Sequence, residues 1–276
     1  MKEHKISKDT QLCISISAKP SNFGTAVFNA AFRAQELDFV YKASRVEDEK
    51  GNLKRAIEGV RVLGIRGCGI SMPFKQEAMR YVDTVDEFAR KIGAINTIVN
   101  TNGALKGYNT DMFGALAVLR TVRGIQKKQV TLLGAGGVAR AICAALAKLS
   151  VENVTIVNRQ RKAGQALADT WDFEYATWKN LETISGNILI NATPVGMPPK
   201  SNETPVSKKL LERYEALVDV VISPHPTKLV RQARTLDMRV IAGHQMSLYQ
   251  AAKQFELYTR KKAPLAIMER AMNTMY

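Results

Sequence analysis

Three glycines stand between an apolar segment and an alanine-rich one in Leu132-Leu133-Gly134-Ala135-Gly136-Gly137-Val138-Ala139-Arg140. An apolar run at residues 129–133 predicts a buried strand before the glycines, and the alanine-rich residues 139–149 predict a helix after them. Strand, glycine turn and helix in this order are typical of a dinucleotide-binding site, whose helix start presents free N–H groups to phosphates. The alternative is an ordinary glycine turn in an α/β protein.

The small residues of this turn have separate predicted roles. Gly134 permits the tight turn, Gly136 lets a pyrophosphate approach the backbone, and Ala139 takes the place of a third small residue for close helix packing. We therefore expect the cofactor to contact Gly134, Ala135, Gly136, Gly137, Val138 and Ala139.

A basic turn follows the next predicted strand, residues 153–157, and consists of Asn158-Arg159-Gln160-Arg161-Lys162. A protein that binds NAD usually places an acid here, on the ribose diol, and this turn contains none. Arg159, Arg161 and Lys162 instead offer cationic donors that suit a 2′-phosphate. The turn, Asn158 included, favours NADP over NAD as the cofactor, although each cation taken singly also fits a solvated loop.

Length and composition indicate how many domains the chain can form and where the protein is located. The 276 residues, 46% of them hydrophobic, can form two domains with substantial cores. No stretch is apolar enough to span a membrane, and the polar N-terminus lacks the apolar core of a secretory signal, so we expect a cytoplasmic protein. The cysteines Cys13, Cys68 and Cys143 are odd in number and far apart, which argues against disulfides and against a zinc site.

The formal net charge of +15 fits either nucleic-acid binding or attraction of an anionic cofactor and a carboxylate substrate. The basic residues are scattered, and no nucleic-acid-binding motif is present. We expect a small-molecule substrate and neither nucleic acid nor membrane as a partner.

Strand and helix patterns alternate along the first half of the chain. Strands are predicted at residues 12–16, 39–43, 63–71 and 94–99, and helices at 23–34, before Val62, at 111–122, at 248–258 and at 264–275. The prediction is an α/β protein with two domains and a cleft between them, hinged near residues 105–125 and near 243. Residues 1–108 and 246–276 would form the substrate-binding domain, and residues 109–245 a Rossmann-type dinucleotide-binding domain.

Lys75 and Asp111 are the candidate acid/base pair. Lys75 follows Pro73, which ends a predicted strand, and Asp111 opens the helix that connects the two domains. A partly buried lysine beside a carboxylate can move the proton of an alcohol. The alternative is that Asp111 only caps its helix and that Lys75 is a surface lysine.

Seven segments, in order, resemble the shikimate dehydrogenase family over nearly the whole chain. They are Pro73-Phe74-Lys75, Gly93 to Thr97, Asn109-Thr110-Asp111 with Gly114, the glycine turn from Gly134 to Ala139, Asn158-Arg159, Asn191 to Met197, and Gly243 to Gln250. Methylenetetrahydrofolate dehydrogenases also join a catalytic lysine domain to a dinucleotide domain, but the segments at 109–111 and 191–197 favour the shikimate family.

The resemblance implies reversible hydride transfer between NADP and the ring carbon that bears one hydroxyl of shikimate, within aromatic amino acid biosynthesis. Lys75 and Asp111 would form the catalytic dyad, Asn96 and Asn109 would position the polyol, and Gln250 would add a substrate hydrogen bond. The loop at 191–197, with Thr193, and Gly243 would lie along the cofactor. The chain would be a monomer or a homodimer.

The departures from the family pattern concern the substrate. Asn22 and Gly24 stand at two positions where the family usually has the serines that hold the substrate carboxylate, and Ser15 and Ser17 lie too early to replace them. Ser71 keeps a hydroxyl in a segment, Gly69-Ile70-Ser71, that has lost the family's asparagine amide.

The resemblance therefore implies substrate contacts through Asn22 and Ser71 and a family member that is weak on shikimate. The alternatives are a dehydrogenase for quinate or an amino-shikimate, and a sensor that binds a metabolite without turnover. The family's tyrosine after the Asp219 strand is Ile222 here, and we assign no role to His225 or His244.

Overall fold

The computed structural model describes residues 6–275 and divides the chain into two compact units. The first unit runs up to Thr110 and resumes at Leu248, and the second comprises Asp111–Ser247. The domain boundaries expected from the sequence lie two residues from these limits.

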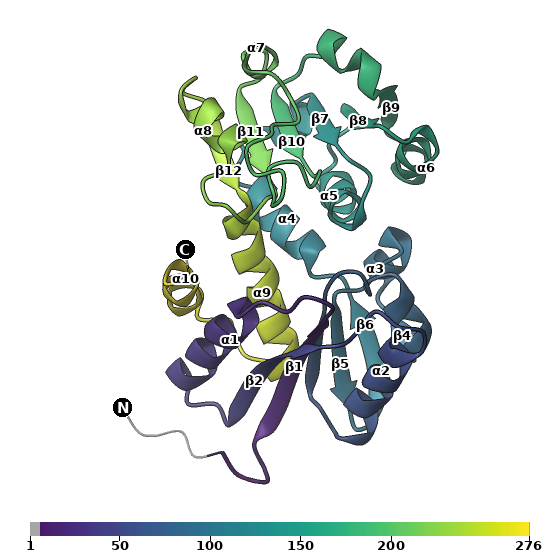
Figure 1. The fold of residues 1–276 in the computed structure, drawn as a ribbon, viewed down its shortest axis with the longest axis vertical. Coiled ribbons are helices and arrows are strands. Elements are labelled where there is room, and N and C mark those ends of the chain that lie inside the picture. Colours follow the sequence, from purple (N-terminus) through teal and green to yellow (C-terminus); the bar gives the residue numbers. More distant parts are fainter. Residues whose placement is uncertain (1–5, 276) are drawn as a thin grey trace. The chain divides into compact units, whose positions relative to one another are not determined.

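The first unit contains a six-stranded mixed sheet in the order β2-β1-β3-β5-β6-β4 (Figure 1). Strand β1 pairs in parallel with β2 and β3, whereas β5 is antiparallel to both β3 and β6. The strands are β1 (Gln11–Ser17), β2 (Phe39–Arg45), β3 (Gly67–Ile70), β4 (Thr84–Val85), β5 (Thr97–Thr101) and β6 (Ala104–Tyr108). The helices are α1 (Phe23–Ala34), α2 (Asn52–Val62), the 3-10 helix η1 (Glu77–Tyr81), α3 (Glu87–Ile92), the part of α9 (Gly243–Thr259) from Leu248 onward, and α10 (Leu265–Asn273).

Two buried clusters hold the first unit together. One is rich in aromatic rings from α1, β2 and α9, among them Phe28, Phe32, Tyr41 and Phe255. The other packs α2, with Leu53 at its start, against buried side chains of β1, β3, β5 and β6. Burial of such side chains contributes about 1.5–3 kcal/mol each, so the helices are held mainly by their apolar faces.

The predicted strand at residues 63–71 is wrong at its start. Strand β3 begins only at Gly67, and Leu63 is the C-cap of α2, followed by Gly64 with a φ of +65°. Val62 and Leu63 are 70% and 75% exposed, so this apolar run ends a helix on the surface.

The second unit contains a six-stranded, wholly parallel sheet in the order β12-β11-β10-β7-β8-β9 (Figure 1). Its strands are β7 (Val130–Leu133), β8 (Val154–Asn158), β9 (Glu174–Thr177), β10 (Ile188–Asn191), β11 (Ala216–Asp219) and β12 (Arg239–Ala242). Its helices are α4 (Asp111–Leu119), η2 (Ile125–Lys127), α5 (Gly137–Lys148), α6 (Arg161–Trp171), η3 (Trp178–Thr183), α7 (Lys208–Leu211) and α8 (Lys228–Arg234). The central strands are buried throughout and mostly apolar, as expected for a parallel sheet covered on both faces.

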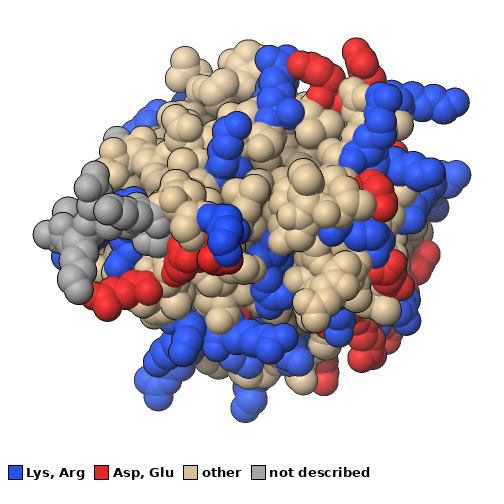
Figure 2. Space-filling view, turned by 90° about the horizontal axis from the view of Figure 1, so that it is seen from below, with Lys and Arg blue, Asp and Glu red and all other residues tan. Residues whose placement is uncertain are grey.

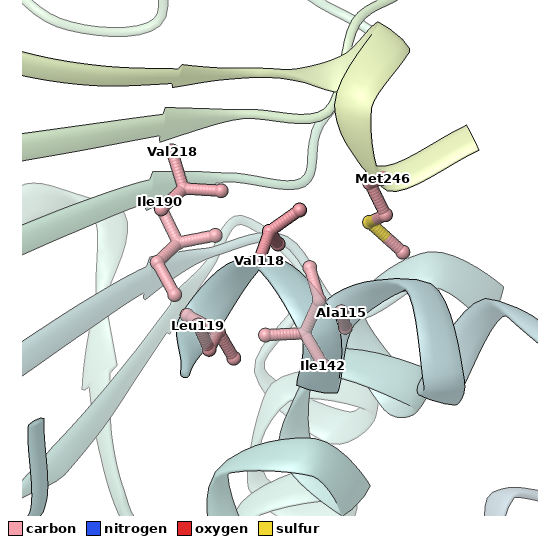
Figure 3. Close-up of a pocket in the computed structure, with 7 residues that line it drawn as sticks. All are labelled: Ala115, Val118, Leu119, Ile142, Ile190, Val218 and Met246. Carbon is pink, nitrogen blue, oxygen red and sulfur yellow. The ribbon is translucent and has the colours of Figure 1, made fainter. Parts of the chain in front are cut away.

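The α/β fold with a parallel sheet around the glycine turn is therefore confirmed. The predicted helix at 111–122 is α4, which ends three residues earlier, at Leu119. Helix α4 packs on α5, and seven apolar side chains surround a small gap between these helices and the sheet (Figure 3). The gap has no room for a water molecule, so it belongs to the core.

Charged side chains and the three cysteines occupy different parts of the structure, the surface and the interior. Lys and Arg side chains are spread over the face shown in Figure 2, with Asp and Glu between them. Cys13, Cys68 and Cys143 are buried free thiols, and burial raises the pKa of each. Within residues 6–275, no helix has the length and hydropathy needed to cross a membrane.

Candidate active site

The glycine turn connects β7 to α5, and its first glycine is required by the backbone. Gly134 has a φ of +107°, a conformation that side chains disfavour. A Cβ atom at this position would lie 2.9 Å from the carbonyl oxygen of Ala192, in the loop after β10. The predicted tight turn at Gly134 is thus present, and the loop after β10 lies directly against it.

The second and third glycines leave open space above the backbone. A Cβ atom on Gly136 or Gly137 would meet no atom of the described chain within 4 Å. Gly136 is exposed and caps α5, whose first N–H groups have no partner within their own helix. Ala139 is fully buried, as close packing of this helix requires. Ala135 and Val138, between these positions, are half-buried. This geometry suits the approach of a pyrophosphate.

The basic turn begins at the end of β8, the neighbour of β7 in the sheet. The Asn158 amide donates to the carbonyl oxygen of Gln160 at 2.9 Å, which fixes the backbone between β8 and α6. Arg159, Arg161 and Lys162 are exposed. Since the carboxyl ends of parallel strands share one edge, this turn and the glycine turn lie at the same edge of the sheet.

A buried hydrogen-bond network organises the loop that covers Gly134. The Asn191 side chain donates to Asp219 Oδ1 at 3.0 Å and accepts from both the backbone N–H and the hydroxyl of Thr193, at 3.1 and 2.7 Å. Thr193 also accepts from the backbone N–H of Val195 at 3.3 Å. Thr193, which we expect at the cofactor, is thereby held in one conformation.

Asp219 joins this loop to the next one along the sheet. Its second oxygen accepts from the Thr227 hydroxyl at 2.6 Å, and Oδ1 also accepts from the N–H of Val221 at 3.2 Å. Burial raises the pKa of Asp219, while the bonds from Thr227, Val221 and Asn191 oppose that rise. We did not predict Asp219 and Thr227 as site residues, although an aspartate that ends the apolar strand Ala216–Asp219 is a signal for such a role.

Gly243 starts α9 in close contact with the end of β11. A Cβ atom there would lie 2.5 Å from the carbonyl oxygen of Val220 and 2.8 Å from that of Val221. Any side chain at 243 would therefore push the two segments apart. The structure explains the glycine by this packing, and its predicted contact with the cofactor stays a prediction.

In the first unit, a polar network surrounds Asn96. The Asn96 side-chain oxygen accepts from the Thr97 hydroxyl at 2.8 Å and from the backbone N–H and hydroxyl of Thr110 at 2.7 and 3.1 Å. Gln250 donates to the same Thr110 hydroxyl at 3.0 Å, and Gln254 donates to Thr97 at 2.8 Å. Asn96 and Gln250, predicted separately as substrate ligands, thus belong to one network, whereas Thr97 and Gln254 were missed.

The other predicted residues of the first unit lie on adjoining segments. Asn109 is buried and donates to the carbonyl oxygen of Ala94 at 2.9 Å. The backbone carbonyl of Lys75 accepts from the N–H of Ile95 at 2.8 Å, which ties the lysine segment to the residue before Asn96. Ser71 is half-buried and follows β3.

The members of the predicted dyad belong to different units. Lys75 is half-buried in the first unit, and Asp111 is 8% exposed at the start of α4 in the second. Asp111 directly follows Thr110, which is anchored to Asn96. The pairing of Lys75 with Asp111 stays a prediction.

The start of α1 differs from the serine clamp of the resemblance. Asn22 is exposed and immediately precedes the helix, and its side chain makes no capping hydrogen bond within the helix. The Thr25 hydroxyl accepts from the backbone N–H of Ala43 at 3.3 Å, so this residue joins α1 to β2. Gly24, in the first turn of α1, is half-buried and faces Tyr41 of β2.

A polar hollow of about 710 Å³ lies at the amino ends of strands in the parallel sheet, away from their carboxyl ends. It is lined by the starts of β7, β8 and β9 and by residues around Thr183. Dinucleotides bind at the carboxyl ends of such strands. This hollow is therefore separate from the candidate cofactor site.

The parallel sheet, its glycine turn and the basic turn at the same edge define a dinucleotide-binding α/β protein with a second α/β unit. Family models match most of the chain: the shikimate dehydrogenase substrate binding domain at residues 20–98, shikimate / quinate 5-dehydrogenase at 117–224, and the shikimate 5′-dehydrogenase C-terminal domain at 243–272. The chain belongs to the shikimate dehydrogenase family.

Individual relatives agree with this assignment. The chain is 38% identical over 259 residues to a shikimate dehydrogenase-like protein of Haemophilus influenzae, covering 93% of each chain. It is 37% identical over 254 residues to a shikimate dehydrogenase (NADP(+)) of Methanothermobacter thermautotrophicus, covering 88% of this chain and 89% of the relative. The solved shikimate 5-dehydrogenase of Thermus thermophilus, in complex with NADP(H) and shikimate, matches with a TM-score of 0.85 and 28% identity, covering 96% of this chain and 99% of that one.

These comparisons confirm the predicted family, the predicted enzyme class and the N-terminal substrate-binding domain. They also confirm NADP as the cofactor of the family. The structure of this chain fits that cofactor, because its glycine turn is open above Gly136 and Gly137 and because its basic turn has cations where NAD would need an acid.

Proposed function

We propose that this chain catalyses the reversible, NADP-dependent oxidation of one ring hydroxyl of shikimate, with low activity because its carboxylate clamp is altered. The observation that carries the proposal is the network of the buried Asn96 and Thr110 with the half-buried Gln250, because its anchored Thr110 directly precedes Asp111. By its family, the chain would act in aromatic amino acid biosynthesis, as a monomer or homodimer with small molecules as its partners. The cytoplasmic location expected from the sequence stays a prediction.

Lys75 and Asp111 would handle the proton of the reacting hydroxyl. Oxidation of the alcohol breaks a C–H and an O–H bond, so one group must accept the hydroxyl proton and return it in the reverse direction. NADP, when bound, would accept the hydride from the ring carbon. Asn96, Asn109 and Gln250 would orient the ring hydroxyls, with Asn22 and Ser71 as further contacts.

The second unit would hold the cofactor at the carboxyl edge of its parallel sheet. The N–H groups at the start of α5 would bind the pyrophosphate, over the open backbone of Gly136 and Gly137. Arg159, Arg161 and Lys162 would bind the 2′-phosphate. The loop with Thr193, fixed by Asn191, would lie beside the rest of the dinucleotide, as would Gly243.

A dehydrogenase for quinate or an amino-shikimate is the second candidate. It is favoured by Gly24, where the family's serine hydroxyl is missing. Loss of one charge-assisted hydrogen bond weakens binding by about 1.5–3 kcal/mol, which is roughly ten- to a hundredfold. A sensor that binds a metabolite without turnover is the third candidate. It is less well supported, because binding alone needs no pair of residues for proton transfer.

The test is NADPH formation by the purified protein with shikimate, quinate and amino-shikimate, in the wild type and in Lys75→Ala. Lys54→Ala, an exposed lysine on α2, is the matched control. We expect turnover of at least one acid by the wild type and the control, and a loss of at least a hundredfold in Lys75→Ala. Binding of NADP with no turnover of any acid would instead support the sensor.

A further inference from the structure

We propose that Tyr41 binds the carboxylate of the substrate, because its hydroxyl stands where a side chain at position 24 would stand and has a proton to donate. This inference rests on the proposed function and names the group that replaces the missing serine hydroxyl. It makes Tyr41 a substrate-binding residue on β2, a strand in which the sequence predicts no site residue.

The first observation is the contact between Gly24 and the tyrosine ring. A Cβ atom at position 24 would lie 2.6 Å from Cε1 of Tyr41 and 2.9 Å from its hydroxyl oxygen. Real Cβ atoms do not approach other atoms so closely, so a serine at 24 and the present position of Tyr41 exclude each other. Glycine at 24 is therefore the partner of this tyrosine.

The second observation is that Gly69, on β3, borders the same hydroxyl. A Cβ atom at position 69 would lie 3.2 Å from the Tyr41 hydroxyl oxygen, 3.4 Å from Cβ of Ser15 and 3.5 Å from Nε2 of Gln254. Two positions that lack side chains thus flank one phenol. Both are positions at which the resemblance implies a polar side chain.

The position of Tyr41 is fixed by three kinds of contact. The Asn29 side chain accepts from the Tyr41 backbone N–H at 2.8 Å and donates to its carbonyl oxygen at 2.9 Å. The ring stacks on Phe28 with centroids 4.5 Å apart and planes at 16°. The residue is only 4% exposed. The ring cannot swing aside cheaply, so its hydroxyl is held in one position.

The chemistry of the phenol suits an anion. Burial raises the pKa of Tyr41, and the Ser15 side chain opposes that rise, so the phenol stays neutral and keeps its proton. A hydroxyl has one donor and two acceptor positions, so it can accept from Ser15 and donate to a carboxylate at the same time. Ser15 itself would support the phenol from β1.

The hydroxyl also borders the polar network proposed to hold the ring of the substrate. Gln254, which lies beside it over Gly69, donates to the Asn96 carbonyl oxygen at 3.2 Å and to the Thr97 hydroxyl at 2.8 Å. A ring hydroxyl bound near Asn96 and a carboxylate bound at Tyr41 would therefore lie in one continuous polar region of the first unit.

The test compares Tyr41→Phe with Tyr258→Phe in the full-length protein. Both changes remove one buried phenol oxygen from the same aromatic cluster, and among the residues described the Tyr258 hydroxyl has no hydrogen-bond partner. The substrates are shikimate and its uncharged methyl ester, with NADP saturating. We expect Tyr41→Phe to raise KM for shikimate roughly ten- to a hundredfold, with kcat within about threefold and a much smaller change for the ester. Tyr258→Phe should match the wild type.

Three outcomes would overturn the inference. An unchanged KM for shikimate in Tyr41→Phe would show that the hydroxyl does not bind the carboxylate. Equal losses for shikimate and the ester, or a fall in kcat at constant KM, would assign Tyr41 a general structural role. If the wild type turns over neither shikimate nor the other two acids, the proposed function fails first, and this inference fails with it.

Discussion

Replacing Gly134 by alanine tests whether the glycine turn is built as the structure shows. The substitution places a Cβ atom 2.9 Å from the Ala192 carbonyl oxygen in a residue with a φ of +107°. Backbone strain of this kind costs about 1–3 kcal/mol, and displacing the loop of Ala192 adds about 1–3 kcal/mol. We expect the free energy of unfolding of the second unit to fall by about 2–6 kcal/mol, with weaker NADP binding.

Gly124→Ala is the matched control. Gly124 also lies in the second unit and has a φ of +66°, but a Cβ atom there would meet no described atom within 4 Å. In this variant only the left-handed backbone should lower the free energy of unfolding, by about 1–2 kcal/mol. Both tryptophans, Trp171 and Trp178, lie in the second unit, so urea denaturation followed by tryptophan fluorescence reports on it. Equal destabilisation by the two substitutions, or unchanged NADP affinity in Gly134→Ala, would refute the reasoning.

Three further predictions concern other residues. Asp219→Ala removes the acceptor of three hydrogen bonds and should lower the free energy of unfolding by about 2–4 kcal/mol. Because burial raises the pKa of folded Asp219, the wild type should lose stability as pH rises from 3.8 through that raised pKa, and urea titrations of Asp219→Asn should lack this loss. Arg159→Ala should weaken NADP binding about tenfold and leave NAD binding unchanged, as measured by calorimetry. Arg123→Ala, at another exposed arginine, is the control. Equal losses of affinity for both cofactors would contradict the 2′-phosphate contact. Gly24→Ser should destabilise the first unit by about 1–3 kcal/mol, and less in a Tyr41→Leu background; additive effects in this double-mutant cycle would contradict the clash.

Local patterns in the sequence predict the second unit well. The order of strand, glycines and helix around Gly134 needs only nearby residues, since the turn, the apolar strand and the alanine-rich helix are each determined within a few positions. The basic turn after β8 is predicted for the same reason. The start of β3 was misplaced because Leu63 is an exposed apolar residue, which the sequence pattern assigned to the buried strand that follows.

The parts that the sequence did not reveal depend on long-range contacts. Tyr41 meets Gly24 and Gly69 only after β2, α1 and β3 have packed together, and no spacing in the sequence encodes that meeting. Asp219 meets Asn191 across neighbouring strands of the parallel sheet. Contacts of this kind join residues that are far apart in the sequence, so only the structure reveals them.

The most direct test of the account is an experimental structure of the wild-type protein with NADP and shikimate bound together. We expect Lys75 Nζ and an Asp111 carboxylate oxygen both to lie within about 3.2 Å of the reacting hydroxyl, with the pyrophosphate at Gly136. A ternary complex in which either side chain lies well beyond hydrogen-bond reach of that hydroxyl would contradict the proposed dyad.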